Sequence, residues 1–96
     1  QDLYLSIASL WEIAIKVSTG KLILHQPYEI LFPSQLNANG IKQLNIDIRH
    51  TTTISRLTFH HNDPFDRMLI AQAISENMTI LSADEAFDAY GITRLW

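Results

Sequence analysis

The sequence predicts an α/β protein in which helices cover both faces of a mostly parallel sheet, giving three layers. Short apolar runs with strand character alternate with helical patterns along the chain, as in a doubly covered parallel sheet. Helix-start signals directly follow several of these runs. The 96 residues are 47% hydrophobic and 18% charged, which suffices for one small domain with a core. We therefore expect a single domain over residues 1–96.

The first half of the chain contains a strand, a helix, a second helical segment and another strand. The first strand is predicted at 3–8 and leads into a helix at 9–18, because Ser9-Leu10-Trp11-Glu12 has the Ser-x-x-Glu spacing of a capping box. Pro27 opens the second helical segment, which Pro33 should interrupt. A strand at 41–46 follows.

The second half contains two full helices and a carboxyl-terminal strand–helix–strand segment. Asp47 lies near the start of a predicted helix at 47–57. Asp63 and Pro64 are suited to the N-cap and first position of the next helix, at 64–77. The remaining elements are a buried strand at 78–81, a short helix at 84–89 and a last strand at 93–96.

Three acids lie at predicted helix starts, Glu12, Asp66 and Asp84, and the helices of Glu12 and Asp84 directly follow predicted strands. Each is explained singly by capping or by the positive helix amino end. In a parallel sheet, however, helices begin beyond the carboxyl ends of strands, where ligands bind. Carboxylates gathered at that edge repel one another unless a cation lies between them, so the pattern predicts a divalent metal site.

Composition excludes some classes of function. The seven basic and ten acidic residues give a formal net charge of −3, which argues against broad non-specific adhesion to nucleic acid. A nuclease whose acids hold metal ions remains compatible, because bound cations reverse the local field. The absence of cysteine excludes disulfides and thiolate metal sites. No apolar run reaches about 18 residues, so we expect a soluble protein.

Several blocks, in the expected order, resemble a PIN domain and, more narrowly, the VapC-type toxins of bacterial toxin–antitoxin pairs. The blocks are 6–16, 20–22, 61–73, 82–91 and 94–96. The resemblance implies a cytoplasmic ribonuclease that hydrolyses RNA phosphodiesters with Mg²⁺ or Mn²⁺. It places Glu12, Asp66 and Asp84 at the second, third and fourth acidic positions, as catalytic and metal-binding residues. It also implies a cognate antitoxin and a homodimer.

The first acidic position of the family has no counterpart here, and Asp2 is a poor substitute for it. That position lies in an opening strand, which in the family lies between the strands predicted at 3–8 and 78–82. We therefore expect the chain to be an amino-terminally truncated form of a longer toxin, lacking its first, central strand. Such a form loses one oxygen ligand of the metal site and is expected to be inactive or to need another chain.

Two further residues are candidates for substrate binding. Ser82 ends a predicted strand and could hydrogen-bond a phosphate, although capping explains it equally well. Arg67 follows Asp66 and could neutralise a phosphate or pair with a neighbouring acid. His50 is a lone histidine, for which a structural or exposed position is the simpler interpretation.

Two other classes of protein are compatible with parts of this pattern. A non-catalytic PIN-like interaction module would explain the missing first acid. A phosphoacceptor receiver domain also gathers acids and Mg²⁺ beyond parallel strands, but it needs a lysine near the end of a late strand. The last lysine here is Lys42, so this class is the weaker one.

Overall fold

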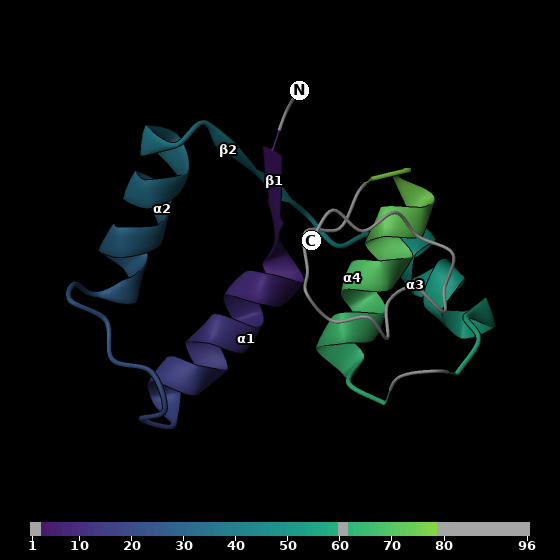
Figure 1. Ribbon diagram of the computed structural model, residues 1–96, viewed down its shortest axis with the longest axis horizontal. Coiled ribbons are helices and arrows are strands. Elements are labelled where there is room, and N and C mark those ends of the chain that lie inside the picture. Colours follow the sequence, from purple (N-terminus) through teal and green to yellow (C-terminus); the bar gives the residue numbers. More distant parts are fainter. Residues whose placement is uncertain (1–2, 60–61, 79–96) are drawn as a thin grey trace. The chain divides into compact units, whose positions relative to one another are not determined.

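The computed structural model describes residues 3–59 and 62–78 (Figure 1). The elements are β1 (Leu3–Ser6), α1 (Ile7–Ser18), α2 (Tyr28–Ala38), β2 (Ile41–Leu44), α3 (Ile48–Arg56) and α4 (Pro64–Ser75). The chain forms two compact units, residues 1–45 and 46–96. Of the predicted elements, the helix at 84–89, the strand at 93–96 and all but the first residue of the strand at 78–81 lie outside the described residues.

The first unit contains a parallel pair of strands. β1 and β2 pair in parallel, with Leu3 opposite Ile41 and Ser6 opposite Leu44. The connection between them runs through α1 and α2, as a parallel pair requires, because a tight turn cannot join parallel strands. The predicted mixed α/β class with a parallel sheet is confirmed.

Helix α1 begins earlier than the sequence pattern predicted. Its N-cap is Ser6, whose side-chain oxygen accepts a hydrogen bond from the backbone N–H of Ala8 at 3.0 Å. The prediction of a capping box between Ser9 and Glu12 is therefore wrong, because both residues lie inside the helix. Ala8 and Leu10 are buried, and the earlier start brings Ala8 into the helix.

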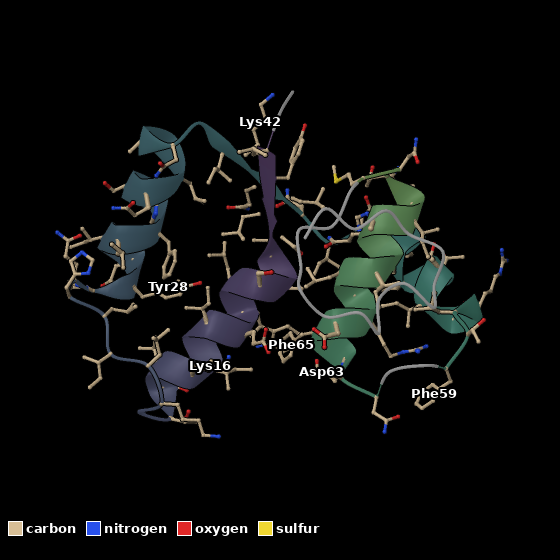
Figure 2. All side chains as sticks on the ribbon, viewed as in Figure 1. Lys16, Tyr28, Lys42, Phe59, Asp63 and Phe65 are labelled. Atoms are coloured by element: carbon tan, nitrogen blue, oxygen red, sulfur yellow. The ribbon has the colours of Figure 1, made fainter. Side chains whose placement is uncertain are left out.

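Helix α2 continues through Pro33, although an interruption there was predicted. A proline inside a helix costs one backbone hydrogen bond, here the bond to the carbonyl of Glu29. Contacts on the opposite side hold the helix: Leu31 is buried, and the Tyr28 and Phe32 rings lie 4.8 Å apart. The Tyr28 hydroxyl also donates to the Leu10 carbonyl of α1 at 2.9 Å, which ties the two helices together (Figure 2).

The second unit packs α3 against α4. Asp47 and Asp63 are the two N-caps, so both predicted helix starts are confirmed. The α4 residues Ile70, Ala71 and Ala73 are buried, and α4 packs against α3. Helix α4 stops at Ser75, two residues before its predicted end, and Asn77 follows with a positive φ of 53°. Asparagine tolerates this left-handed conformation, which commonly terminates helices.

None of the helices within residues 3–59 and 62–78 has the length and apolar character needed to cross a membrane.

Candidate functional site

Asp66 lies in the first turn of α4, and hydrogen bonds to the Asp63 side chain hold this turn. The Asp63 side chain accepts hydrogen bonds from the backbone N–H groups of Phe65 at 2.8 Å and Asp66 at 3.1 Å. Pro64 occupies the first helical position, where its missing N–H costs nothing. Asp63 thus acts as the helix cap. The carboxylate of Asp66 is left half-buried at the positive end of the helix, where negative charge is favoured.

Glu12 lies in the second turn of α1 and is half-buried. Because Ser6 caps the helix, the capping role that would have explained this acid does not apply. Across the part of the chain that the structure describes, the Glu12 carboxylate takes part in no hydrogen bond or ion pair. Within the described residues, helix capping therefore does not account for Glu12.

The remaining predicted site residues, Asp84 and Ser82, lie outside the described residues. Glu12 belongs to the first compact unit and Asp66 to the second, and each unit is described by itself. The convergence of Glu12, Asp66 and Asp84 on one ion therefore stays a prediction.

Arg67 is buried, and its guanidinium lies against backbone carbonyls and an aromatic ring. Its guanidinium donates to the carbonyls of Thr58 at 3.4 Å, Leu57 at 3.4 Å and Ile54 at 3.5 Å. The guanidinium carbon also lies 4.7 Å from the centre of the Phe59 ring, within the range of a cation–π contact. These partners belong to the end of α3 and the segment after it.

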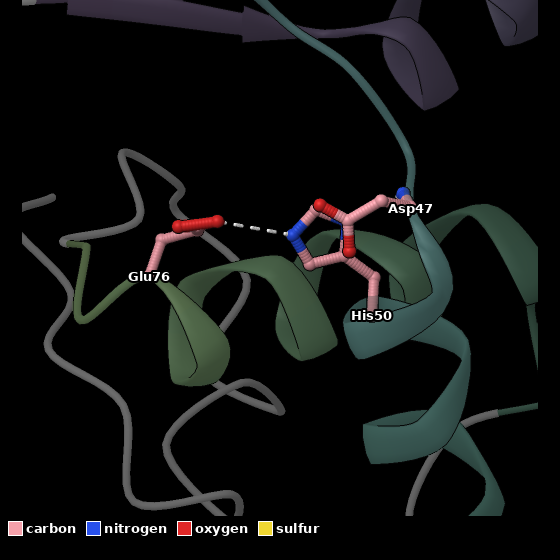
Figure 3. A group of neighbouring side chains, drawn as sticks. All are labelled: Asp47, His50 and Glu76. Atoms are coloured by element: carbon pink, nitrogen blue, oxygen red, sulfur yellow. Dashed lines mark hydrogen bonds and ion pairs between the residues drawn. The ribbon is translucent and has the colours of Figure 1, made fainter.

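Sequence reasoning missed a second group of ionisable side chains, formed by Asp47, His50 and Glu76. Their potential metal-binding atoms all lie within 4.8 Å of one another (Figure 3). The fully buried His50 accepts a hydrogen bond at Nδ1 from the backbone N–H of Asp47 at 3.1 Å. Its Nε2 lies 3.4 Å from Glu76 Oε1. The detectable signal was the Asp47-x-x-His50 spacing, in which histidine takes the place of glutamate in a capping box.

The charges of this group are already balanced within the protein. Arg49 forms ion pairs with both Asp47 and Glu76. The side-chain hydrogen bond from Arg49 holds the pKa of the Asp47 carboxyl below its usual value of 3.8. Because Nδ1 accepts a hydrogen bond from the backbone N–H of Asp47, the ring proton lies on Nε2, directed at Glu76. With both nitrogens used and a guanidinium beside both acids, the group fits a structural network better than a metal site.

A comparison with family models decides the class of protein. The model of the PIN domain matches residues 1–92. The chain belongs to the PIN domain family. PIN domains are generally nucleases and typically use a divalent metal. No curated protein and no solved structure matches the chain.

Two of the acids expected in a PIN domain suit a hard divalent cation. Glu12 and Asp66 are half-buried carboxylates that offer only oxygen donors, which Mg²⁺ and Mn²⁺ prefer. Asp63 serves as the N-cap of α4, so Asp66 is not the capping residue of its helix. Each of these two carboxylates, taken singly, therefore offers the kind of donor that the family's divalent metal takes.

Proposed function

We propose that this PIN domain is a metal-dependent ribonuclease, the toxin of a toxin–antitoxin pair. The observation that carries the proposal is the first turn of α4. There a cap supplied by Asp63 holds the half-buried Asp66 at the positive helix end. Glu12 supports it, because its carboxylate has no role in starting its own helix.

In this proposal Glu12, Asp66 and Asp84 hold Mg²⁺ or Mn²⁺, and the ion supplies activation of water and stabilisation of the leaving oxygen. The positive amino end of α4 favours negative charge on the Asp66 side chain. Ser82 is assigned to a hydrogen bond with a substrate phosphate. RNA is the expected substrate, a cognate antitoxin the expected partner, a homodimer the expected assembly and the cytoplasm the expected compartment.

The experiment compares cleavage of a fluorescent single-stranded RNA by the chain and by the variants Glu12→Gln and Asp66→Asn. We expect each variant to lower kcat/KM at least about a hundredfold, the scale of losing one electrostatic contributor to the transition state. Glu29→Gln, an exposed acid in the first turn of α2, is the matched control and should retain activity. Chelation of the metal should abolish cleavage.

The predicted truncation is tested by repeating the cleavage assay on a longer chain that includes the natural upstream segment. Recovery of cleavage only in the longer chain would support both the truncation and the nuclease. Absence of metal-dependent cleavage in both chains would overturn the nuclease proposal and favour a PIN-like module that binds a partner without catalysis.

A further inference from the structure

The guanidinium of Arg67 is the most buried cationic group within the described residues, with a relative exposure of 9% for the residue. Burial of a charge requires hydrogen-bonding partners, and three carbonyls supply them. Phe59 covers one face of the guanidinium while its own ring remains 70% exposed. We call Arg67, Phe59 and the carbonyls of Ile54, Leu57 and Thr58 the Arg67 contact group. Phe59 is labelled in Figure 2.

The carbonyls of this group lie at and just beyond the carboxyl end of α3. Ile54 belongs to its last turn, Leu57 is its C-cap, and Thr58 follows. The Ile54 carbonyl also accepts the backbone N–H of Leu57. Carbonyls at the carboxyl end of a helix carry partial negative charge, so a cation is favoured there. Hydrogen bonds to a charged donor are roughly twice as strong as neutral ones. Arg67 therefore fastens α4 to the end of α3.

The same contact group acts on the turn that carries Asp66. Arg67 is the next residue in α4, and its backbone N–H donates to the Asp63 carbonyl at 3.0 Å. The backbone of Arg67 is thus fixed by the N-cap residue and its side chain by α3. Together these contacts set the rotation of α4 about its axis, and with it the direction of the neighbouring Asp66 side chain.

We infer that Arg67 is a positioning residue, which sets the direction of Asp66 by fastening the amino end of α4 to the carboxyl end of α3. We propose this positioning role in place of the phosphate contact that the sequence suggested for Arg67. The catalytic part of this inference rests on the proposed nuclease function, whereas the local effect on the α4 turn can be measured without it.

The first experiment is amide hydrogen exchange on the metal-free chain carrying Arg67→Met, which keeps the length of the side chain and removes its donors. We expect the Phe65 and Asp66 amides, both bonded to Asp63, to exchange roughly tenfold faster or more, the scale of losing charged hydrogen bonds. Amides of β1 and α1 should be unchanged. Arg56→Met, an exposed arginine at the end of α3, is the matched control. Unchanged exchange of Phe65 and Asp66 would overturn the inference.

The second experiment separates positioning from phosphate binding and from general stability. It is run at a temperature where wild-type chain, Arg67→Met and Arg67→Lys are all folded. A positioning role predicts weaker Mn²⁺ binding and a lower kcat, with KM and the salt dependence of RNA binding unchanged. A phosphate contact predicts a higher KM and a salt slope reduced by about one, which would contradict the inference.

Arg67→Lys tests geometry rather than charge, because lysine cannot reach three carbonyls in the fixed fork of a guanidinium. We expect it to resemble Arg67→Met rather than the wild-type chain. Full recovery by lysine would overturn positioning by the contact group. Should the wild-type chain itself neither bind Mn²⁺ nor cleave RNA, the proposed function fails, and the exchange measurement still decides the role of Arg67.

Discussion

His50 shows how one buried polar residue can join two helices. Its ring has no exposed surface, and each nitrogen faces a partner: the backbone N–H of Asp47 at the start of α3 and the carboxylate of Glu76 at the end of α4. Satisfied in this way, the ring adds specificity to the packing of α3 on α4. Without its partners the same burial would be unfavourable.

We expect His50→Ala to lower the free energy of unfolding by about 2–4 kcal/mol, since it opens a cavity and removes the acceptor of the Asp47 backbone N–H and one partner of the Glu76 carboxylate. Urea unfolding followed by circular dichroism measures the change. Ile48→Ala, at a position in α3 that is 80% exposed, should change stability by less than about 0.5 kcal/mol. A loss of similar size in both variants would contradict the role given to His50.

The Asp47 carboxyl gives the protein an acid-sensitive helix start. Arg49 lowers the pKa of Asp47 in the folded state, first through a side-chain hydrogen bond. A lowered pKa contributes stability that is fully present above the usual value of 3.8 and is lost as pH falls through the lower folded value. Asp47→Asn keeps a cap and removes the charge. The stability difference between the two chains, from urea unfolding, should therefore be constant above about pH 5 and shrink below 3.8; a difference independent of pH would contradict it.

At the scale of elements, the sequence predicted the helix starts that depend on one unambiguous signal. Asp63-Pro64 is such a signal, because proline fixes the backbone of the first helical residue, and α4 begins there. For α1 the sequence analysis predicted a start at the Ser9–Glu12 capping box, whereas Ser6 is the N-cap in the structure. Burial of Ala8 and Leu10, a property of the packed unit, favours the earlier serine. The position of Glu12 relative to its helix start was wrong for this reason.

The choice between the two serines can be measured. Ser6→Ala removes the observed N-cap and should lower the free energy of unfolding by about 1 kcal/mol. Ser9→Ala replaces an interior helix residue with a better helix former and should leave stability unchanged or slightly higher. Urea unfolding of the two variants side by side gives the comparison. The reverse order would restore the Ser9 start and the capping role of Glu12.

For the whole molecule, the parallel α/β class and the PIN family were predicted correctly, because both depend on the order of elements and on short local motifs. The site is different in kind, since it depends on acids that are distant in the chain. Helix-start patterns identify Glu12, Asp66 and Asp84 one at a time, and no local sequence pattern predicts the distances between these side chains in the folded chain. The Asp47, His50 and Glu76 group was missed for the same reason, because Glu76 joins it only when α4 packs on α3.

Metal-induced stabilisation tests whether the distant acids share one ion. A ligand that binds only the folded state raises the free energy of unfolding by RT ln(1 + [L]/Kd), about 2.7 kcal/mol at a hundredfold excess over Kd. We expect Mn²⁺ to stabilise the chain in this way, and Glu12→Gln and Asp66→Asn each to remove most of the increment. The control Glu29→Gln should retain it.

The double variant shows whether the two acids act together. If both contact the same ion, the loss in the Glu12→Gln, Asp66→Asn chain should be little larger than in either single variant, because the effects of residues that share a partner are not additive. Independent sites would instead give additive losses. Glu76→Gln completes the test: loss of the Mn²⁺ increment in this variant alone would move the metal to the Asp47, His50 and Glu76 group. That result would leave Glu12 and Asp66 without the cation on which the nuclease proposal depends.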